Sequence, residues 1–198
     1  SDFNFSANAE GASSDKVQTL TAGPTKTNAT SSMSNEVLMG YFARVNYDFA
    51  KKYLVSVSFR ADASSRFAKG HKWGYFPAAS AGWIMSEEDF MKGIANTLSF
   101  LKFKVSYGQT GNNVVGLYDA LGSYAVNKYN GAAGMYPSGM PNEDLTWETT
   151  TQLDAGFEFG LFNNRIFFTG DYFHKVTDDL LFDVNLPNTS GFSKVKTN

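Results

Sequence analysis

The chain has 198 residues, a formal net charge of -2, 42% hydrophobic and 16% aromatic residues, and no cysteine. The near-neutral charge excludes the basic surface expected for nucleic-acid binding, and the absence of cysteine excludes disulfides and thiol chemistry. No run of about 18 apolar residues occurs, which excludes a helical membrane protein, although alternating membrane strands escape that test.

The N-terminal part predicts a loop followed by two paired strands. Residues 7–35 are rich in Ser, Thr, Ala, Asn and Gly, a composition typical of a long loop. Apolar and polar residues then alternate over 41–48 and 53–62, which predicts two strands. The segment 49–52 is short enough for a turn between them, and 63–72 is expected to be a polar loop.

The middle of the chain predicts two more strands. Residues 75–85 are rich in small residues, and Pro77 places the strand start or a bulge near its position. Residues 86–91 predict one helical turn, with Ser86 as the cap and acidic residues at the positive end of the helix dipole. A strand is predicted at 98–108, and 109–144 is predicted to be a long loop rich in Gly, Tyr and Asn.

The clearest pattern is a long hairpin near the C-terminus. Its arms, 145–160 and 166–175, alternate apolar and polar residues, with Trp147 on the apolar side. Asn163 and Asn164 between them suit a tight turn, because Asn tolerates positive φ. A further strand is expected at 180–184.

In a meander, successive connections alternate between the two ends of the sheet. One end collects the long or medium connections at 7–35, 63–73 and 109–144. The other end collects 49–52, 86–97 and 161–165, which apart from 86–97 are tight turns. Outer-membrane barrels show this asymmetry, with long loops outside and short turns in the periplasm.

These patterns predict an all-β antiparallel meander of about six or seven strands that forms part of a large transmembrane β-barrel. The arms exceed the usual globular strand of about 5–6 residues, and a tilted membrane strand needs about 9–11. Residues 1–198 are interpreted as an internal portion of such a barrel, with 7–35 and 109–144 as long outer loops. A secreted soluble β-sandwich that binds carbohydrate remains the alternative; it would bury the apolar faces in a two-layer core.

The barrel interpretation assigns the polar side of each strand to the lumen. The residues predicted to face it are Arg44, Arg60, Lys102, Lys104, Glu148, Gln152, Asp154 and Asp171. Both charge signs occur, so these side chains can pair with each other or with a plug. The corresponding apolar side is predicted to contact lipid.

The sequence gives no catalytic, metal or cofactor site. His71 and His174 are the only imidazoles, and no metal-binding spacing is present. The candidates for contact with a ligand or partner protein are four loop tyrosines, Tyr118, Tyr124, Tyr129 and Tyr136. Their rings could stack on sugars or pack on a lid protein; packing within the loop is the alternative.

Several stretches, taken together and in order, resemble the SusC/RagA family of TonB-dependent outer-membrane transporters. They comprise Tyr41–Asp48 with Lys52–Leu54, Ser58–Phe67 with Trp73–Pro77, Val105–Asn113, Asn142–Leu153 with Gly156–Arg165, and Asp179–Leu181 with Leu186–Phe192. The resemblance covers about residues 36–198. The combination is specific, whereas any one motif would be weak.

The resemblance implies a bacterial outer-membrane importer of glycans or peptides, without enzyme activity. It implies capture of cargo with a SusD-like surface lipoprotein and release driven by the TonB complex through a plug. No plug domain and no TonB-contact segment is recognised in this chain, so no energy-coupling residue is assigned. This chain would supply barrel wall, lumen lining and outer loops, in contact with outer-membrane lipid.

Overall fold

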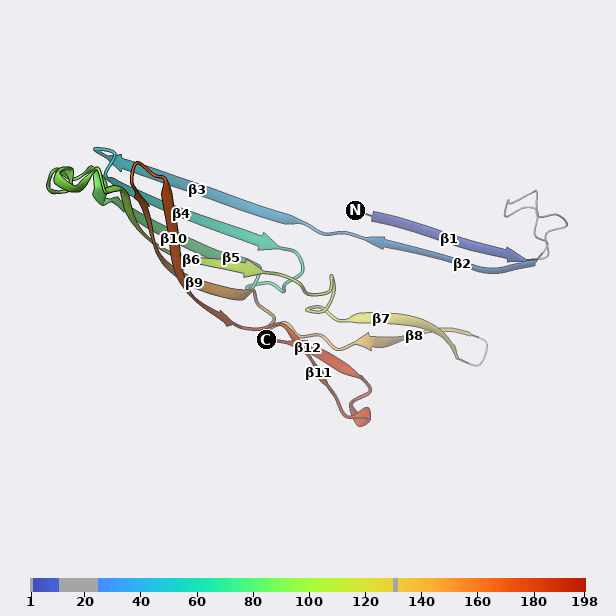
Figure 1. The fold of residues 1–198 in the computed structure, drawn as a ribbon. Coiled ribbons are helices and arrows are strands. Elements are labelled where there is room, and N and C mark those ends of the chain that lie inside the picture. Colours follow the sequence, from blue (N-terminus) through green and yellow to red (C-terminus); the bar gives the residue numbers. More distant parts are fainter. Residues whose placement is uncertain (1, 11–24, 130–131) are drawn as a thin grey trace. The chain divides into compact units, whose positions relative to one another are not determined.

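The structure is a computed structural model that describes residues 2–10, 25–129 and 132–198. Contacts divide the chain into two units, Ser1–Val37 and Leu38–Asn198. Within the described residues, no helix is long and apolar enough to cross a membrane. The ribbon in Figure 1 follows the chain from blue to red.

The first unit is an antiparallel hairpin of β1 (Asp2–Glu10) and β2 (Thr25–Ser34), with Asp2 opposite Ser34. The prediction of an unbroken loop over 7–35 was therefore wrong for residues 7–10 and 25–34. The loop was predicted from composition, because Ser and Asn are common in loops. Thr, however, is also common in strands. Backbone pairing needs no apolar face, so the polar residues still form a ladder.

The second unit contains a six-stranded antiparallel sheet in the order β10-β9-β6-β5-β4-β3. Its strands are β3 (Leu38–Phe49), β4 (Tyr53–Ser64), β5 (Trp73–Ile84), β6 (Leu98–Asn112), β9 (Glu148–Leu161) and β10 (Ile166–Asp178). Each strand has 12 to 15 residues, long enough to cross a bilayer at a tilt. The predicted all-β antiparallel meander is confirmed, and within the described residues the sheet does not close into a barrel.

Tight turns close two hairpins of the sheet. Ala50 and Lys51 have φ of 54° and 57°, the left-handed conformation that tight hairpin turns use. Phe162, Asn163 and Asn164 also have positive φ at the β9–β10 turn, and the backbone N–H of Asn163 donates to Ser99 Oγ at 2.7 Å. Both predicted turns are therefore present.

The connection from β5 to β6 is helical, as predicted, but it is built differently. It consists of two 3-10 helices, η1 (Met85–Glu87) and η2 (Asp89–Ile94). Ser86 lies inside η1 rather than before it, so the prediction that it caps the helix was wrong. Neither helix has a side-chain capping bond.

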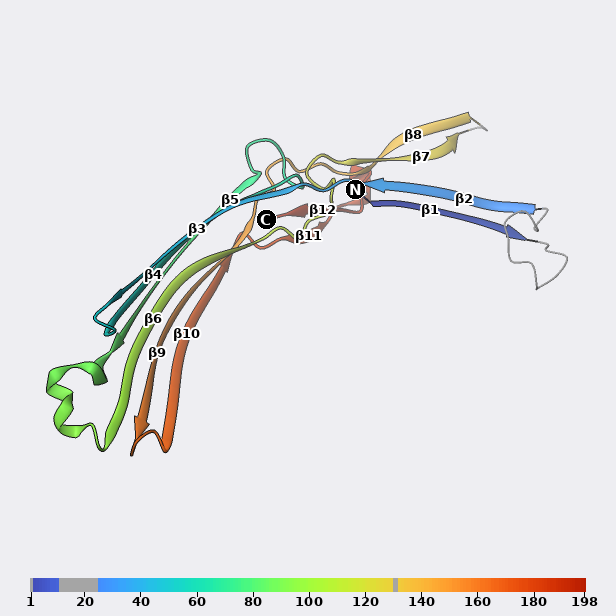
Figure 2. The same ribbon diagram turned by 90° about the horizontal axis from the view of Figure 1, so that it is seen from above.

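The connections of the sheet differ at its two ends, as Figures 1 and 2 show. One end, here called the turn end, carries the β3–β4 turn, η1 with η2, and the β9–β10 turn. The other, the loop end, carries the 65–72 connection, the 113–147 connection and the segment after β10. Apart from the connection that contains η1 and η2, the predicted separation of short and long connections is present in the second unit.

The loop end contains hairpins where a loop was predicted. β6 continues to Asn112, and β7 (Ser123–Tyr129) pairs with β8 (Ala132–Gly139) inside the 109–144 segment. After β10 the chain forms a second small hairpin, β11 (Phe182–Asn185) and β12 (Lys194–Thr197), with the 3-10 helix η3 (Asn188–Ser190) between them. The predicted strand at 180–184 is thus shifted toward the C-terminus.

A small hydrophobic core fixes the loop end. Its buried members are Phe67, Ala68, Phe76, Val115, Ala120, Leu145 and Trp147. The ring of Trp147 lies 5.4 Å from that of Phe67 and 5.5 Å from that of Phe76. A Cβ at position 74 would meet the rings of Phe76 and Trp147, so Gly74 gives these rings their space.

Trp147 corrects the sequence prediction, which placed it on the apolar side of the long hairpin. β9 begins at Glu148, so the alternation that holds along the strand does not extend to the residue before it. Trp147 turns into the core instead, where its indole N–H donates to the carbonyl of Lys72 at 3.0 Å.

Candidate functional site

The register of the sheet separates side chains into two faces. Opposed residues lie on one face, so Val45, Val57, Ala79, Tyr107 and Leu153 form one continuous row across five strands. The neighbouring row is Arg44, Ser58, Ala78, Gly108 and Gln152. Because side chains alternate along each strand, these two rows lie on opposite faces.

The apolar face carries groups of aromatic side chains toward both ends and mainly aliphatic ones between them. The loop-end aromatic group is Tyr41, Phe59, Trp73 and Tyr75, and the turn-end aromatic group is Tyr47, Phe49, Tyr53, Trp83 and Phe103. Rings stack within each group: Tyr41 on Trp73 at 6.1 Å, and Tyr47 on Phe49 at 6.5 Å. This pattern is typical of a membrane barrel, in which aromatic girdles flank an apolar band.

The apolar face is exposed, which decides between the two fold alternatives. A two-layer sandwich would bury Val55, Val57, Phe103, Val105, Leu153 and Phe157. Each of these side chains is between 38% and 52% exposed. No second layer covers this face within the described residues, so the structure does not favour the sandwich.

The eight residues predicted to face the lumen all lie on the polar face. Arg44 is on β3 and Arg60 on β4; Lys102 and Lys104 are on β6; Glu148, Gln152 and Asp154 are on β9; Asp171 is on β10. The register therefore brings together residues from five strands. Whether this face lines a lumen is part of the function proposed below.

An ion network joins three strands on the polar face. Lys104 Nζ lies 3.2 Å from Glu158 Oε1 and 2.9 Å from Asp171 Oδ1. Nearby, Asp154 accepts hydrogen bonds from Ser106 Oγ at 3.1 Å and from Gln152 Nε2 at 2.8 Å. These contacts pair charged and polar side chains of β6, β9 and β10 with one another on this face.

Polar contacts continue toward the loop end. Arg60 Nε pairs with the buried carboxylate of Asp62 at 2.5 Å. Glu148 accepts hydrogen bonds from Asn112 Nδ2 and from the backbone N–H of Leu181, both at 3.1 Å. These contacts fix the path of the chain where the strands give way to the loops.

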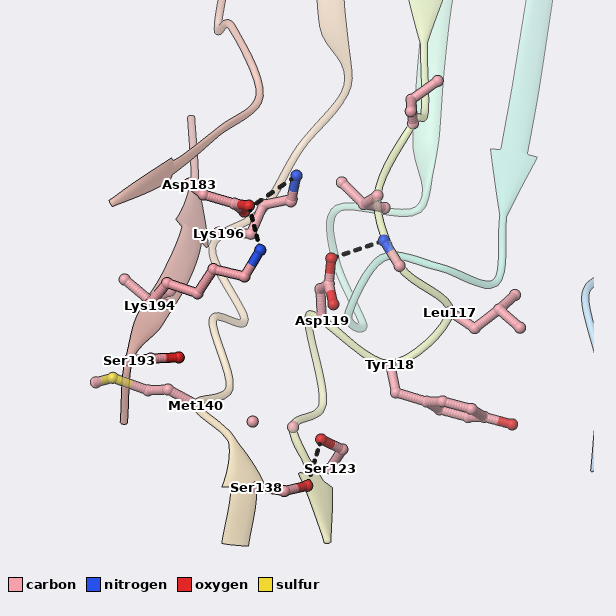
Figure 3. Close-up of a pocket in the computed structure, with 16 residues that line it drawn as sticks. Leu117, Tyr118, Asp119, Ser123, Ser138, Met140, Asp183, Ser193, Lys194 and Lys196 are labelled. Atoms are coloured by element: carbon pink, nitrogen blue, oxygen red, sulfur yellow. Dashed lines mark hydrogen bonds and ion pairs between the residues drawn. The ribbon is translucent and has the colours of Figure 1, made fainter. Parts of the chain in front are cut away.

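A cavity of about 610 Å³ lies at the loop end, between the 114–123 segment and the β11–β12 hairpin. Figure 3 shows the two lysines of β12 directed toward Asp183, with Asp119 and Tyr118 on the segment across from them. Both polar and apolar groups line the cavity, which is wide enough for part of a small oligomer.

Charges around the cavity are balanced. Asp183 pairs with Lys194 Nζ at 2.6 Å and Lys196 Nζ at 3.2 Å. These hydrogen bonds, the one from Lys194 foremost, hold the pKa of Asp183 below its ordinary value. Asp119 accepts a hydrogen bond from the backbone N–H of Gly116 at 2.6 Å, and Ser123 and Ser138 share one at 3.0 Å.

The four tyrosines predicted as contacts do not form one site. Tyr118 lines the cavity. Tyr124 pairs with Pro137 and Tyr136 with Ala125, so Tyr124 and Tyr136 lie on opposite faces of the β7–β8 hairpin. The side chain of Tyr129 lies outside the described residues. The prediction that these tyrosines contact a ligand or partner stays a prediction.

Sequence reasoning missed the charged residues of the cavity, Asp119, Asp183, Lys194 and Lys196. The signal was available for the last three. Lys194 and Lys196 alternate around Val195, and the short run Phe182–Asn185 carries Asp183. Treating these two runs as a hairpin would have placed the aspartate opposite Lys196, as the register does.

The described residues contain no group of three or more His, Asp, Glu or Cys side chains placed to hold a metal ion. The chemistry available to this face and to the cavity is ion pairing, hydrogen bonding and aromatic contact. A sheet with one lipid-like face and one ion-paired face is a section of the wall of a membrane β-barrel.

Comparison with known proteins agrees with this class. The chain matches the family described as TonB dependent receptor-like, beta-barrel, over residues 1–197. It is 37% identical to the TonB-dependent receptor SusC of Bacteroides thetaiotaomicron over 174 residues, which are 83% of this chain and 17% of that protein. It is 39% identical to the TonB-dependent receptor P39 of Formosa agariphila over 166 residues, which are 83% of this chain and 16% of the relative.

Solved structures give the same result. The RagAB peptide importer in its closed-closed state matches with a TM-score of 0.87 and 32% identity, over 96% of this chain and 21% of that chain. The chain belongs to the TonB-dependent receptor β-barrel family, and the predicted SusC/RagA resemblance is confirmed. It spans about a sixth to a fifth of the length of these relatives.

Proposed function

We propose that this chain forms barrel wall and outer-end structure of a transporter that imports glycans or peptides across the bacterial outer membrane. The observation that carries the proposal is the division of one sheet into an aromatic-flanked apolar face and an ion-paired polar face. The first faces lipid, and the second faces the lumen.

The height of the apolar band supports this placement. From Tyr41 to Phe49 there are eight residue steps on β3, which at about 3.3 Å each give roughly 26 Å along the strand. A tilt of about 35–45° reduces this to about 20 Å across the membrane, close to the apolar band of about 25 Å on known barrels. The turn end then lies in the periplasm, and the loop end lies outside the cell.

The strand edges add a constraint. β3 and β10 are the edge strands of the described sheet, and an open edge in lipid leaves backbone groups without partners at a cost of several kcal/mol each. In the whole protein, further strands complete the barrel. A SusD-like lipoprotein at the loop end and a TonB-driven plug are the partners that membership of the family implies.

The cavity at the loop end is proposed to contact cargo. It combines a tyrosine, hydroxyl groups and both charge signs without a strong net charge, which suits a neutral or zwitterionic oligomer. The similar RagAB structure is of a peptide importer. The resemblance to SusC-type transporters makes glycans an equal candidate for the cargo of this chain.

A pair of substitutions at Ser138 tests the cavity in the full-length protein. Ser138→Trp fills the cavity, whereas Ser138→Ala removes only the hydrogen bond with Ser123. We expect the first to reduce TonB-dependent uptake and the second to leave it unchanged, at equal amounts of protein in the outer-membrane fraction. Equal uptake by both variants would remove the cavity from the cargo path, and a full-length product that is soluble without detergent would remove the transport proposal.

A further inference from the structure

A second cavity, with a volume of about 360 Å³, lies on the polar face at the loop end. Residues of β3, β4, β5 and β6 line it, together with Asn113 and Trp147, and it shares no lining residue with the 610 Å³ cavity. Phe42 is opposite Arg60, and Arg60 is opposite Phe76, so these three side chains lie on one face. The second cavity is therefore on the side of the sheet that is proposed to face the lumen.

The inner wall of the second cavity is aromatic and fixed in position. Phe76 and Trp147 are buried there, and both belong to the loop-end core. A Cβ at position 111 would meet the ring of Phe76, so Gly111 allows that ring to lie against β6. Because this wall is already ordered by the core, a ligand does not have to order it, which lowers the entropic cost of binding.

The outer wall combines an exposed aromatic ring with two guanidinium groups. Phe42 is 64% exposed, and the guanidinium of Arg44 lies over its ring, 5.7 Å from the centroid. Ser58, which is opposite Arg44, lines the cavity too. The side chain of Arg60 is 63% exposed. An apolar surface and positive charge are thus accessible side by side.

The charges of the second cavity are not balanced. Asp62 is the only acidic residue among those that line it, and its carboxylate is paired with Arg60 Nε at 2.5 Å. Within the described residues, the terminal nitrogens of Arg60 make no hydrogen bond and Arg44 makes no ion pair. One positive charge is therefore in excess, and the N–H groups of a guanidinium match the two oxygens of a carboxylate.

We propose that the second cavity binds a carboxylate at the end of the cargo, with Arg44 and Arg60 donating to its oxygens and Phe42 packing on the adjoining apolar group or sugar ring. The inference rests on the proposed transport function and names the chemistry of one cargo group. Position favours cargo over another part of the protein, because Asn113 lines this cavity and the next residue, Val114, lines the 610 Å³ cavity. A peptide C-terminus and an acidic sugar on a glycan both supply such a carboxylate.

Calorimetric titration of the full-length protein in detergent tests the carboxylate site with two matched pairs of probes. One pair is tetra-alanyl-phenylalanine and its C-terminal amide. The other pair is xylotetraose with and without a glucuronic acid side group. We expect wild type to bind the acid of at least one pair about tenfold more tightly than its neutral partner, and the pair that shows the preference identifies the source of the carboxylate.

Substitutions at Arg44 assign that preference to the second cavity. Arg44→Gln removes the excess charge without leaving a buried carboxylate unpaired, and it should abolish the preference. Arg44→Lys keeps the charge and should retain most of the preference. The matched control is Arg165→Gln, which removes an exposed arginine at the turn end and should bind both pairs as wild type does.

The outcomes separate this site from the transport proposal. Lack of preference for the acid in both pairs, or an Arg44→Gln variant that keeps the preference, would overturn the carboxylate site. A lower melting temperature of Arg44→Gln without any acid preference in wild type would overturn it as well, since the arginine would then pair within the protein. TonB-dependent uptake in cells would leave the transport proposal intact in all these cases, whereas full-length protein that stays soluble without detergent would overturn that proposal itself.

Discussion

The hydroxyl of Tyr53 donates a 2.7 Å hydrogen bond to Oε1 of Glu88, which joins β4 to the helical segment that follows β5. The same oxygen accepts the indole N–H of Trp83 at 3.2 Å, and Lys52 Nζ lies 3.1 Å from Oε2. One carboxylate therefore satisfies the polar ends of two rings of the turn-end aromatic group. Buried or interfacial Tyr and Trp usually need such partners.

Replacement of Glu88 by Gln should change how stability depends on pH. Hydrogen bonds from Tyr53, Lys52 and Trp83, in that order, lower the pKa of Glu88 from 4.5. A lowered pKa in the folded state stabilises it above pH 4.5, and this contribution is lost as pH falls through the folded value. We expect Glu88→Gln in the full-length protein to have a lower melting temperature than wild type at pH 7. On acidification to pH 3.5, its melting temperature should fall less than that of wild type.

The neighbouring Glu87 provides the control for that experiment. It is exposed in η1, and within the described residues its side chain makes no hydrogen bond to the aromatic group. Glu87→Gln should therefore follow wild type at both pH values in the same thermal melts. Identical pH profiles for all three proteins would show that Glu88 does not stabilise this end.

Replacement of Trp147 by Ala should be among the most destabilising changes at the loop end. The ring is buried between Phe67 and Phe76, and truncation of a buried Trp costs about 3–5 kcal/mol. Trp147→Phe keeps part of the packing and should cost less. Denaturant unfolding of the full-length protein in detergent measures the cost of both substitutions. A cost below about 1 kcal/mol for Trp147→Ala would contradict the buried position and favour the lipid-facing one predicted from the sequence.

A lysine at position 153 should destabilise the protein far more than one at position 152. Leu153 lies in the middle of the proposed lipid-facing band, where lysine costs about 2–4 kcal/mol. Gln152 lies on the opposite face beside Asp154, which can pair with the new charge. Equal free energies of unfolding in detergent or lipid for Leu153→Lys and Gln152→Lys would contradict the assignment of the two faces.

Glycine at position 51 should stabilise the β3–β4 hairpin. Lys51 has a φ of 57°, a conformation that costs a residue with a side chain roughly 1 kcal/mol and glycine much less. The backbone bond from its N–H to Asp48 Oδ1 is retained. Lys52→Gly, one residue on, removes the ion pair with Glu88 and should lower stability, so unfolding experiments on the two variants should give changes of opposite sign.

The strands and their faces could be predicted because alternation is local. One strand alone shows which side chains share a face: Val55, Val57 and Phe59 lie on one side, and Ser56 and Ser58 on the other, whichever strands pair with it. The pairing of β6 with β9 could not be derived in the same way, because residues 113–147 separate them and the sequence contains no local record of that register. The assumption of an antiparallel meander gave the order of the strands, and the register came from the structure.

The errors arose where composition was used in place of backbone geometry. Ser, Thr and Gly are common in exposed loops, yet β2, β7 and β8 are paired strands. The prediction for Trp147 was wrong for a related reason. The alternation of faces holds only within the strand, and Trp147 precedes its first residue, Glu148, so its side chain packs with the loops. The cavity residues were missed because they meet only after two short hairpins fold back on the loop end.

Within the described residues, the outer edges of β3 and β10 have no strand partner, which has a consequence for biogenesis of the proposed barrel. Each edge exposes backbone groups that lipid cannot satisfy, so this section cannot enter a bilayer ahead of its neighbours. It must insert together with the barrel strands that pair with it on both sides. A mutation that delays the folding of a neighbouring strand would therefore hold this sheet in the periplasm. There it would be open to chaperones and proteases, even though its own sequence is unchanged.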